Sequence, residues 1–102
     1  MGEGIQVEVK KKVWLEHKNM PLMGRGRYEI LKCIDTTHSI KETAKHLHIT
    51  EKTIQNYITK MENRLGKRIT ISYRGGRIGG GYSQLTPTGR QLLELFEKHD
   101  EK

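Results

Sequence analysis

Between Ser39 and Gly66, apolar side chains recur at helical spacing in two consecutive runs. The first run comprises Ile40, Ala44 and Leu47, and the second Ile54, Ile58, Met61 and Leu65. Each run predicts one amphipathic helix, and the second helix is the longer. Only a tight turn at His48-Ile49 joins them. The stretch therefore predicts a helix pair, in which the small side chain of Ala44 allows a close crossing.

The ends of both predicted helices carry capping residues. Ser39 is followed three positions later by Glu42, which is the spacing of a capping box. Thr50 can cap the second helix, and Gly66 stands just after its end, where glycine is favoured. The outer face of the second helix is polar and comprises Lys52, Gln55, Asn56, Thr59 and Asn63.

A helix pair in which one helix offers polar groups to base edges or phosphates is the helix-turn-helix plan. An ordinary amphipathic hairpin of an unrelated helical domain is the alternative, and this stretch alone leaves both open.

Upstream, the apolar positions alternate with polar ones from Ile5 to Leu15, which predicts a half-buried strand interrupted at Lys11. His17-Lys18-Asn19 predicts a turn, and residues 20–23 a short returning strand that Pro21 restricts to an edge. This N-terminal hairpin, residues 5–23, is rich in lysine. A solvated edge that resists aggregation is the favoured interpretation, and a phosphate contact is the alternative.

The sequence GRGR, residues 24–27, precedes a helix predicted from Arg27 to about Thr36. Its two glycines favour a flexible helix entry over an anion-binding nest. The wide apolar face of this helix suggests that it packs behind the helix pair, so that residues 27–66 form a three-helix core. Cys33 lies within this pattern and is interpreted as a structural thiol, since no neighbour would lower its pKa.

After Gly66 the period changes from helical to alternating, with Ile69, Ile71 and Tyr73 on one side of a predicted strand. A glycine-rich segment, residues 75–81, leads into a returning strand, YSQLT. Lys67, Arg68, Arg74 and Arg77 make this hairpin, residues 67–86, basic, with no acidic residue between Gly66 and Gly81. We interpret it as a wing, because glycine allows close approach to a phosphate or a minor groove. A nucleotide-binding glycine loop is disfavoured, since no helix starts at the loop and no Lys-Ser/Thr follows.

Thr86-Pro87 opens a last helix, residues 87–99, with threonine at the N-cap and proline at the first helical position. One stripe of this helix carries Leu92, Leu95, Phe96 and His99. The stripe can close the core or pair with its copy in a second subunit. We expect a homodimer through this stripe, with the edges of the first hairpin as the rival surface.

The chain has 102 residues, enough for one domain, with 19 Lys plus Arg against 12 Asp plus Glu. This excess favours a polyanionic partner, with nucleic acid ahead of an anionic membrane surface, because no stretch has the length of a spanning helix. A single cysteine fits a reducing cytoplasm. His46 and His48 are too few for a metal site, no catalytic constellation stands out, and no cofactor is implied.

The order and spacing of HSIKETAKHLHITEKTIQNYITKMENRLG, an arginine-rich strand and LTPTG resemble the winged helix-turn-helix domain of LysR-type regulators. The glycine-rich YRGGRIGGGYSQLT before LTPTG, with VWLE and GRGRYEIL upstream, is more similar to the DNA-binding domain of ModE-type molybdate-responsive regulators. The resemblance covers about residues 13–93. It implies an α+β fold and a DNA-binding regulator.

Two departures qualify the resemblance. ModE-type proteins commonly carry tryptophan where Gln55 stands, and glutamine can pair with adenine in a way that an indole cannot, so the family's operator cannot be assumed. The oxyanion-binding domain that would follow the last helix is also missing from the sequence. We therefore expect effector sensing to be absent, indirect or supplied by a separate effector-sensing subunit.

Taken together, residues 1–102 predict one winged helix-turn-helix domain that binds double-stranded DNA and is not an enzyme. Its helix from Thr50 enters the major groove, with Lys52, Gln55 and Asn56 at base edges. The predicted backbone or minor-groove contacts are Thr50, Thr59, Lys60, Arg64, Arg74 and Arg77. The alternative is a winged-helix module for protein–protein interaction.

Overall fold

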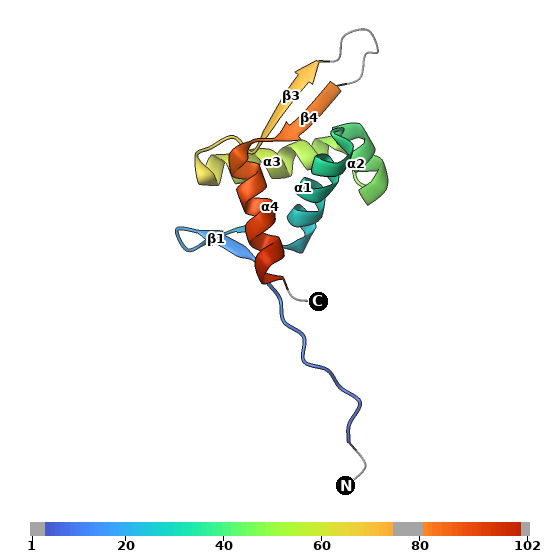
Figure 1. Ribbon diagram of the computed structural model, residues 1–102, viewed down its shortest axis with the longest axis vertical. Helices are drawn as coiled ribbons and strands as arrows, with labels where there is room; N and C mark the ends of the chain where they lie inside the picture. The colour runs from blue at the N-terminus through green and yellow to red at the C-terminus, as the bar shows by residue number, and fades with distance from the viewer. Residues whose placement is uncertain (1–3, 75–80, 101–102) are drawn as a thin grey trace.

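The computed structural model describes residues 4–74 and 81–100. In these residues four helices and two antiparallel hairpins follow one another along the chain (Figure 1). The elements are β1 (Leu15–His17), β2 (Met20–Met23), α1 (Arg25–Thr37), α2 (Ile40–Leu47), α3 (Glu51–Leu65), β3 (Thr70–Arg74), β4 (Gly81–Leu85) and α4 (Pro87–His99). The predicted α+β winged helix-turn-helix class is confirmed.

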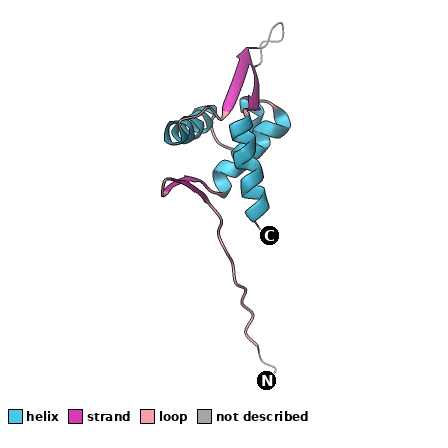
Figure 2. Cartoon of the chain, turned by 60° about the vertical axis from the view of Figure 1, so that its left-hand side comes forward, coloured by secondary structure: helices cyan, strands magenta, loops and turns pink. Residues whose placement is uncertain are grey.

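The core lies between the four helices, and the two hairpins project from opposite ends of this helical body (Figure 2). Each helix contributes one apolar face, as the periodicity predicted for α3. The buried hydrophobic residues of the three longer helices are Ile30, Leu31, Ile34, Ile54, Ile58, Met61, Leu92, Leu93 and Phe96. From the hairpins and the segments beside them come Leu22, Met23, Ile69 and Leu85.

The predicted helix caps are confirmed. Ser39 Oγ accepts the Glu42 N–H at 2.9 Å, and Thr50 Oγ1 accepts the Thr53 N–H at 3.0 Å. Gly66 ends α3 with φ 75°, in the left-handed region that glycine adopts without strain. The capping box of α2 is completed differently, because Thr37 Oγ1 rather than Glu42 accepts the Ser39 N–H, at 3.2 Å.

The long strand predicted from Ile5 to Leu15 is wrong over most of its length. β1 begins only at Leu15 and pairs with β2 in a register that sets Leu15 opposite Met23 and His17 opposite Met20. Residues 4–12 leave the body as an extended arm without strand pairing, and Val13 packs against the core (Figure 1). The physical reason is that β2 ends at Met23 and runs directly into α1, so no strand lies opposite residues 5–13.

The GRGR segment is mostly helix rather than loop. Gly24 is the N-cap of α1 and the helix begins at Arg25, two residues earlier than predicted, so Gly26 lies in its first turn. The helix ends at Thr37, and His38 follows in the left-handed conformation with φ 56°. The anion-nest alternative therefore loses the loop that it required.

The predicted dimer stripe of α4 is divided between the core and the surface. Phe96 is fully buried and stacks on Tyr28 with 4.7 Å between ring centroids, and Leu92 is 9% exposed. Leu95, in contrast, is 47% exposed. Of the two roles left open for the stripe, Phe96 and Leu92 take the first and close the core, because they lie on the sector of α4 that faces the protein's own interior.

Polar contacts fasten α4 along α1. The Tyr28 hydroxyl donates to Glu97 at 2.8 Å, and the Lys32 ammonium lies 3.1 Å from the same carboxylate. These two groups lower the pKa of Glu97, the Tyr28 hydrogen bond contributing most. One turn further along α1, the Asp35 carboxylate pairs with Arg90 of α4 at 2.7 Å. These contacts join side chains far apart in sequence, which periodicity does not reveal.

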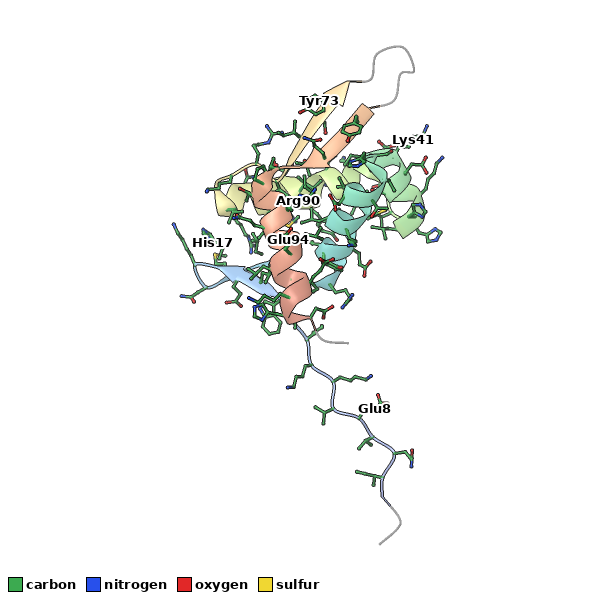
Figure 3. The ribbon with its side chains drawn as sticks, in the orientation of Figure 1. Glu8, His17, Lys41, Tyr73, Arg90 and Glu94 are labelled. Carbon is green, nitrogen blue, oxygen red and sulfur yellow. The ribbon has the colours of Figure 1, made fainter. Side chains whose placement is uncertain are left out.

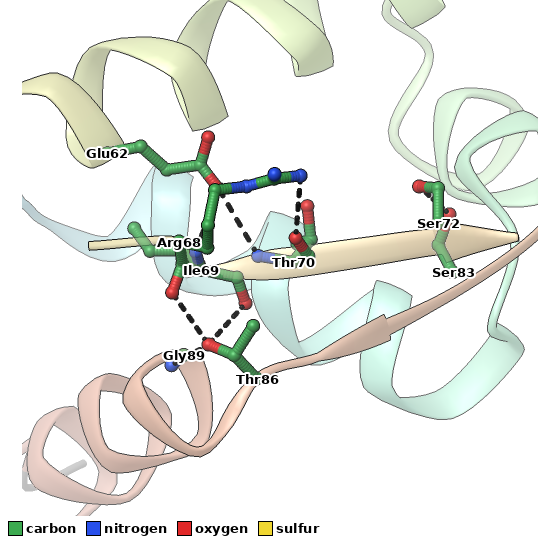
Figure 4. A network of polar contacts seen from close by, with 8 residues as sticks. All are labelled: Glu62, Arg68, Ile69, Thr70, Ser72, Ser83, Thr86 and Gly89. Atoms are coloured by element: carbon green, nitrogen blue, oxygen red, sulfur yellow. Dashed lines mark hydrogen bonds and ion pairs between the residues drawn. The ribbon is translucent and has the colours of Figure 1, made fainter.

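A tight backbone joint links α4 to the start of the wing (Figure 4). Thr86 Oγ1 donates to the Arg68 carbonyl at 2.7 Å and accepts the Gly89 N–H at 3.0 Å, which confirms Thr86 as the N-cap of α4. Its own N–H donates to the Ile69 carbonyl at 2.9 Å. A Cβ on Gly89 would lie 2.3 Å from that carbonyl oxygen. The LTPTG motif therefore encodes this joint.

Gly89→Ala should destabilise the fold by about 2–3 kcal/mol, because the added methyl collides with backbone that cannot rotate away. Gly26→Ala is the matched control, since a Cβ there meets open space within α1 and should add about 0.5 kcal/mol of stability. Urea denaturation measures both. If both substitutions change the free energy of unfolding by equally small amounts, the close contact between Gly89 and the Ile69 carbonyl is not a constraint on the fold.

Glu97→Gln should lower the free energy of unfolding at neutral pH by about 0.5 kcal/mol, because it removes a half-exposed charged contact. The folded-state pKa of Glu97 lies below its ordinary value of 4.5, so this stabilisation is present above pH 4.5 and is lost as the pH falls through the folded pKa. The wild-type advantage over the variant should therefore shrink in acid.

Urea denaturation at about pH 7 and about pH 3 tests this dependence. Glu94→Gln on the same helix is the control, since Glu94 makes no ion pair among the described residues. If Glu97→Gln lowers the free energy of unfolding equally at both pH values, or no more than Glu94→Gln does, the ionised Glu97 carboxylate does not stabilise the fold.

Candidate nucleic-acid interface

The turn between α2 and α3 is closed by backbone hydrogen bonds. His48 adopts φ 57°, and the Ile49 N–H donates to the Ala44 carbonyl at 3.1 Å. Ala44 itself is only 8% exposed, as expected of a small residue at a helix crossing. Left-handed conformations are uncommon outside glycine but occur more often in histidine, asparagine and aspartate. His48 therefore has a conformational role in the turn.

The outer face of α3 carries the polar residues that the sequence predicted. Ile54, Ile58 and Met61 point into the core, with at most 3% of each residue exposed. The exposed residues on the other side are Lys52, Gln55, Asn56, Thr59, Lys60 and Asn63. This face is a row of uncharged amides and a hydroxyl framed by two lysines, a composition suited to base edges and phosphates.

Thr50 and Arg64, two further predicted contact residues, are engaged within the protein. The Thr50 hydroxyl accepts the Thr53 N–H and donates to Thr53 Oγ1 at 2.9 Å. Arg64, in the last turn of α3, donates from its guanidinium to the Pro21 carbonyl in β2. Their observed contacts position the two ends of α3.

The wing is a regular antiparallel hairpin as far as it is described. β3 and β4 pair from Thr70 opposite Leu85 to Arg74 opposite Gly81. Ser72 and Ser83 form a cross-strand hydrogen bond of 2.9 Å between hydroxyls. Two predicted elements lie outside the description: the glycine-rich tip, residues 75–80, which includes Arg77, and the side chain of Arg74.

An aromatic and polar contact fixes the wing to the helical body. The ring of His38 stacks on Tyr82 with 4.8 Å between centroids, and the Ser83 N–H donates to the His38 carbonyl at 2.9 Å. The His38 Nδ1 lies 3.3 Å from the Ser83 carbonyl, which requires a proton on that nitrogen. Tyr73 extends the aromatic group at 6.2 Å from Tyr82 and is half-exposed (Figure 3). Sequence reasoning missed His38, whose partners lie 44 and 45 residues downstream.

Glu62 joins the wing to α3 (Figure 4). Its carboxylate accepts the Ile69 N–H at 2.7 Å and the Thr70 N–H at 3.4 Å, and it lies 3.3 Å from Arg68 Nε. Arg68, predicted as one of four unopposed wing charges, is therefore paired with an acid from the preceding helix. The root of β3 is fixed to α3 through this carboxylate.

The helix α2 contributes basic residues that the sequence analysis did not select. Lys41 and Lys45 are exposed and one turn apart, and Lys41 lies on the same side of the molecule as β4 of the wing (Figure 3). Lys45 is 3.6 Å from Glu42, so part of its charge is balanced. Sequence reasoning could have selected both lysines, because they lie on the polar side of a short amphipathic helix.

Other kinds of site find no support in the described residues. No cluster of three or more His, Cys, Asp or Glu side chains there is placed to hold a metal ion. Within the same residues, every helix is too short or too polar to cross a membrane. Among the described residues, the polar face of α3 and the basic wing are therefore the candidate site.

Comparison with known proteins places this fold among bacterial regulators. Residues 26–90 match the bacterial regulatory helix-turn-helix proteins of the lysR family. The molybdenum-pterin-binding protein MopB of Rhodobacter capsulatus is 31% identical over 74 residues, which are 72% of this chain and 27% of MopB. The chain thus spans about a quarter of that relative's length.

Two solved structures share the fold. ArgP from Mycobacterium tuberculosis matches with a TM-score of 0.59 and 22% identity, covering 76% of this chain and 26% of ArgP. The BenM DNA-binding domain, in a complex with the benA site 1 DNA, matches with a TM-score of 0.57 and 21% identity, covering 74% of this chain and 81% of that domain. At these identities the likeness establishes the architecture.

Proposed function

Because the chain belongs to the lysR family of bacterial regulatory helix-turn-helix proteins, we propose that it is a sequence-specific, DNA-binding transcription regulator that acts in the cytoplasm. The observation that carries this proposal is the exposed polar face of α3, which is held beside a basic hairpin. The BenM domain, which shares this fold, is bound to DNA in its solved complex. A formal charge of +7 supports the same partner.

In the proposed complex, α3 lies in the major groove. Lys52, Gln55 and Asn56, near its N-terminal end, are assigned to base edges, and Thr59 and Lys60 to the DNA backbone. Arg74 and Arg77 of the wing reach an adjacent groove or phosphate. Thr50 and Arg64 orient α3 through the internal contacts described above. Lys41 is added to the backbone contacts because it is exposed on the same side of the molecule as β4.

We further propose that the protein acts as a homodimer, because two recognition helices on one two-fold axis read a pair of half-sites. Leu95, the exposed apolar member of the α4 stripe, is assigned to the dimer surface. It borders a groove of about 640 Å³ whose apolar lining includes Leu65 and Leu92. An antiparallel pairing of the two α4 helices would cover this groove. The expected operator is an imperfect palindrome.

Binding to random duplex DNA should be strongly salt-dependent. If each subunit neutralises about four to six phosphates, the slope of log affinity against log salt should be roughly −4 to −5 per subunit. Fluorescence anisotropy over a range of salt concentrations measures this slope. A flat response is the result expected of a protein–protein module or of a partner of a separate effector-sensing subunit, and it would exclude the DNA proposal.

Replacing Arg74 and Arg77 together by Ala should weaken binding to all duplexes and make the slope shallower by about 2, because two phosphate contacts are lost. The matched control is the pair Lys11→Ala and Lys18→Ala, which removes the same charge from the arm and from the turn between β1 and β2. Equal losses in the two double variants would show that only net charge matters. The wing would then have no role of its own.

Gln55→Ala should relax base preference at one operator position, with a loss of about 1–3 kcal/mol on the preferred sequence if the contact is bidentate. Its motivation is the exposed position of Gln55 on the outer face of α3. Thr36→Ala, at an exposed position of α1 outside both the α3 face and the α4 groove, is the control and should change neither property. Selection from a random DNA pool gives the preference, and titration gives the affinity. An equal loss on specific and random DNA would assign Gln55 to the backbone.

A further inference from the structure

His38 is the residue at which the wing meets the start of the helix-turn-helix. It follows the last residue of α1, and the next residue, Ser39, is the N-cap of α2. Its ring stacks on Tyr82 of β4 with an angle of 11° between the two planes. A single side chain thus connects β4 with the segment that leads into α2.

The backbone of His38 supplies only half of a strand pairing with β4. Its carbonyl accepts the Ser83 N–H at 2.9 Å, as a third strand beside β4 would do. Its own N–H, however, donates to the Ile34 carbonyl at 2.8 Å and closes the end of α1. The His38 backbone therefore has no donor left for the Ser83 carbonyl.

The imidazole ring supplies the missing donor. Nδ1 lies 3.3 Å from the Ser83 carbonyl, and because a carbonyl can only accept, the proton is on Nδ1. Both backbone groups of Ser83 are then bound by one residue. Since Ser83 is only 3% exposed, a carbonyl without this donor would be costly. The ring acts as a substitute for the N–H of a third strand.

A second histidine shows that the left-handed backbone alone does not require such a ring. His48 follows α2 as His38 follows α1, and it has nearly the same φ, 57° against 56°. The His48 side chain is exposed, and it forms no aromatic stack or hydrogen bond with any other residue that the structure describes. Of the two histidines, only His38 combines this backbone with a contact to the wing.

We propose that the His38 side chain is a positioning residue for DNA binding, because it sets the angle of the wing relative to the helix-turn-helix. At this angle the wing arginines and the polar face of α3 reach the same duplex. This inference rests on the proposed function, and it extends that function from the contact residues to a residue that acts through β4.

The position of Ser83 along the wing explains why this contact controls the angle. Glu62 and the Thr86 joint hold the wing at its root (Figure 4). Ser83 lies further along β4 toward the tip, so the contact with His38 is a second point of attachment. A hairpin attached only at its root can tilt, and an isolated two-stranded ribbon is marginal in water. The ring restricts the tilt that the root leaves open.

A graded series of substitutions tests the role of the ring. Asparagine and glycine both accept the left-handed backbone at little cost. His38→Asn removes the ring and keeps a donor near the position of Nδ1, whereas His38→Gly removes both. His48→Asn and His48→Gly are the matched controls, because they make the same changes at the equivalent position after α2. Urea denaturation verifies that all four variants fold.

Binding to random duplex over a range of salt concentrations gives the first readout. His38→Gly should weaken binding by about tenfold and make the salt slope shallower by about 1, because a tilted wing neutralises fewer phosphates. His38→Asn should lie between the wild type and His38→Gly. The His48 variants should keep the wild-type slope. Equal slopes in the His38 and His48 variants would overturn the proposal.

A double-mutant cycle separates positioning from a general loss of stability. If His38 acts through the wing, replacing Arg74 and Arg77 together by Ala should cost less affinity in the His38→Gly background than in the wild type. A merely structural role would lower the free energy of unfolding and leave the two losses in affinity additive. Additive losses would therefore overturn the proposal.

Nitrogen NMR of the imidazole rings tests the contact itself and needs no DNA. At a pH at which the rings are neutral, His38 should carry its proton on Nδ1. The exposed ring of His48 should show the Nε2–H form that a free histidine side chain prefers in water. A proton on Nε2 of His38 would overturn the proposal.

Failure of this proposal is distinct from failure of the proposed function. A flat salt response of the wild type would exclude DNA binding and the positioning role together. A salt-dependent wild type with an additive cycle would leave DNA binding in place and overturn only the role of His38.

Discussion

The contact between the backbone of α4 at Gly89 and the carbonyl of Ile69 is the constraint on which the arrangement of this domain depends. It holds only because residue 89 lacks a Cβ, which would otherwise lie 2.3 Å from the carbonyl oxygen. The hydrogen bonds of the Thr86 hydroxyl to the Arg68 and Ile69 carbonyls and from the Gly89 N–H fix the same point, so the two ends of the wing are held together there. The remaining contacts of the wing orient it around this joint.

Two acceptors on different helices set that orientation. The Glu62 carboxylate of α3 receives the N–H groups at the root of β3, and the His38 carbonyl after α1 receives the Ser83 N–H of β4. Since α3 also carries the outward polar face, the recognition helix and the wing share a rigid connection. The proposed function requires this property, because base contacts and backbone contacts must be in register with each other on one duplex.

Local signals in the sequence predicted the helices, their caps and the wing strands, since Ser39, Thr50, Gly66 and Thr86 act through neighbours a few residues away. The same reasoning predicted which side of α3 faces outward. It failed where the partner is distant in sequence: Arg64 donates to Pro21, Arg68 meets Glu62, and His38 stacks on Tyr82. It also failed for the arm. Alternation of apolar and polar residues is typical of a strand, but it does not show whether a second strand lies beside the segment.

The attachment of α4 has a mechanical consequence. This helix is fastened along α1 by ion pairs at its surface, and it is joined end-on to the wing through backbone hydrogen bonds. The root of the wing is held on its other side by Glu62 of α3. Rotation of α4 about its own axis would therefore break hydrogen bonds at the root of the wing, so a load applied to α4 is transmitted to the wing and α3 as one rigid body.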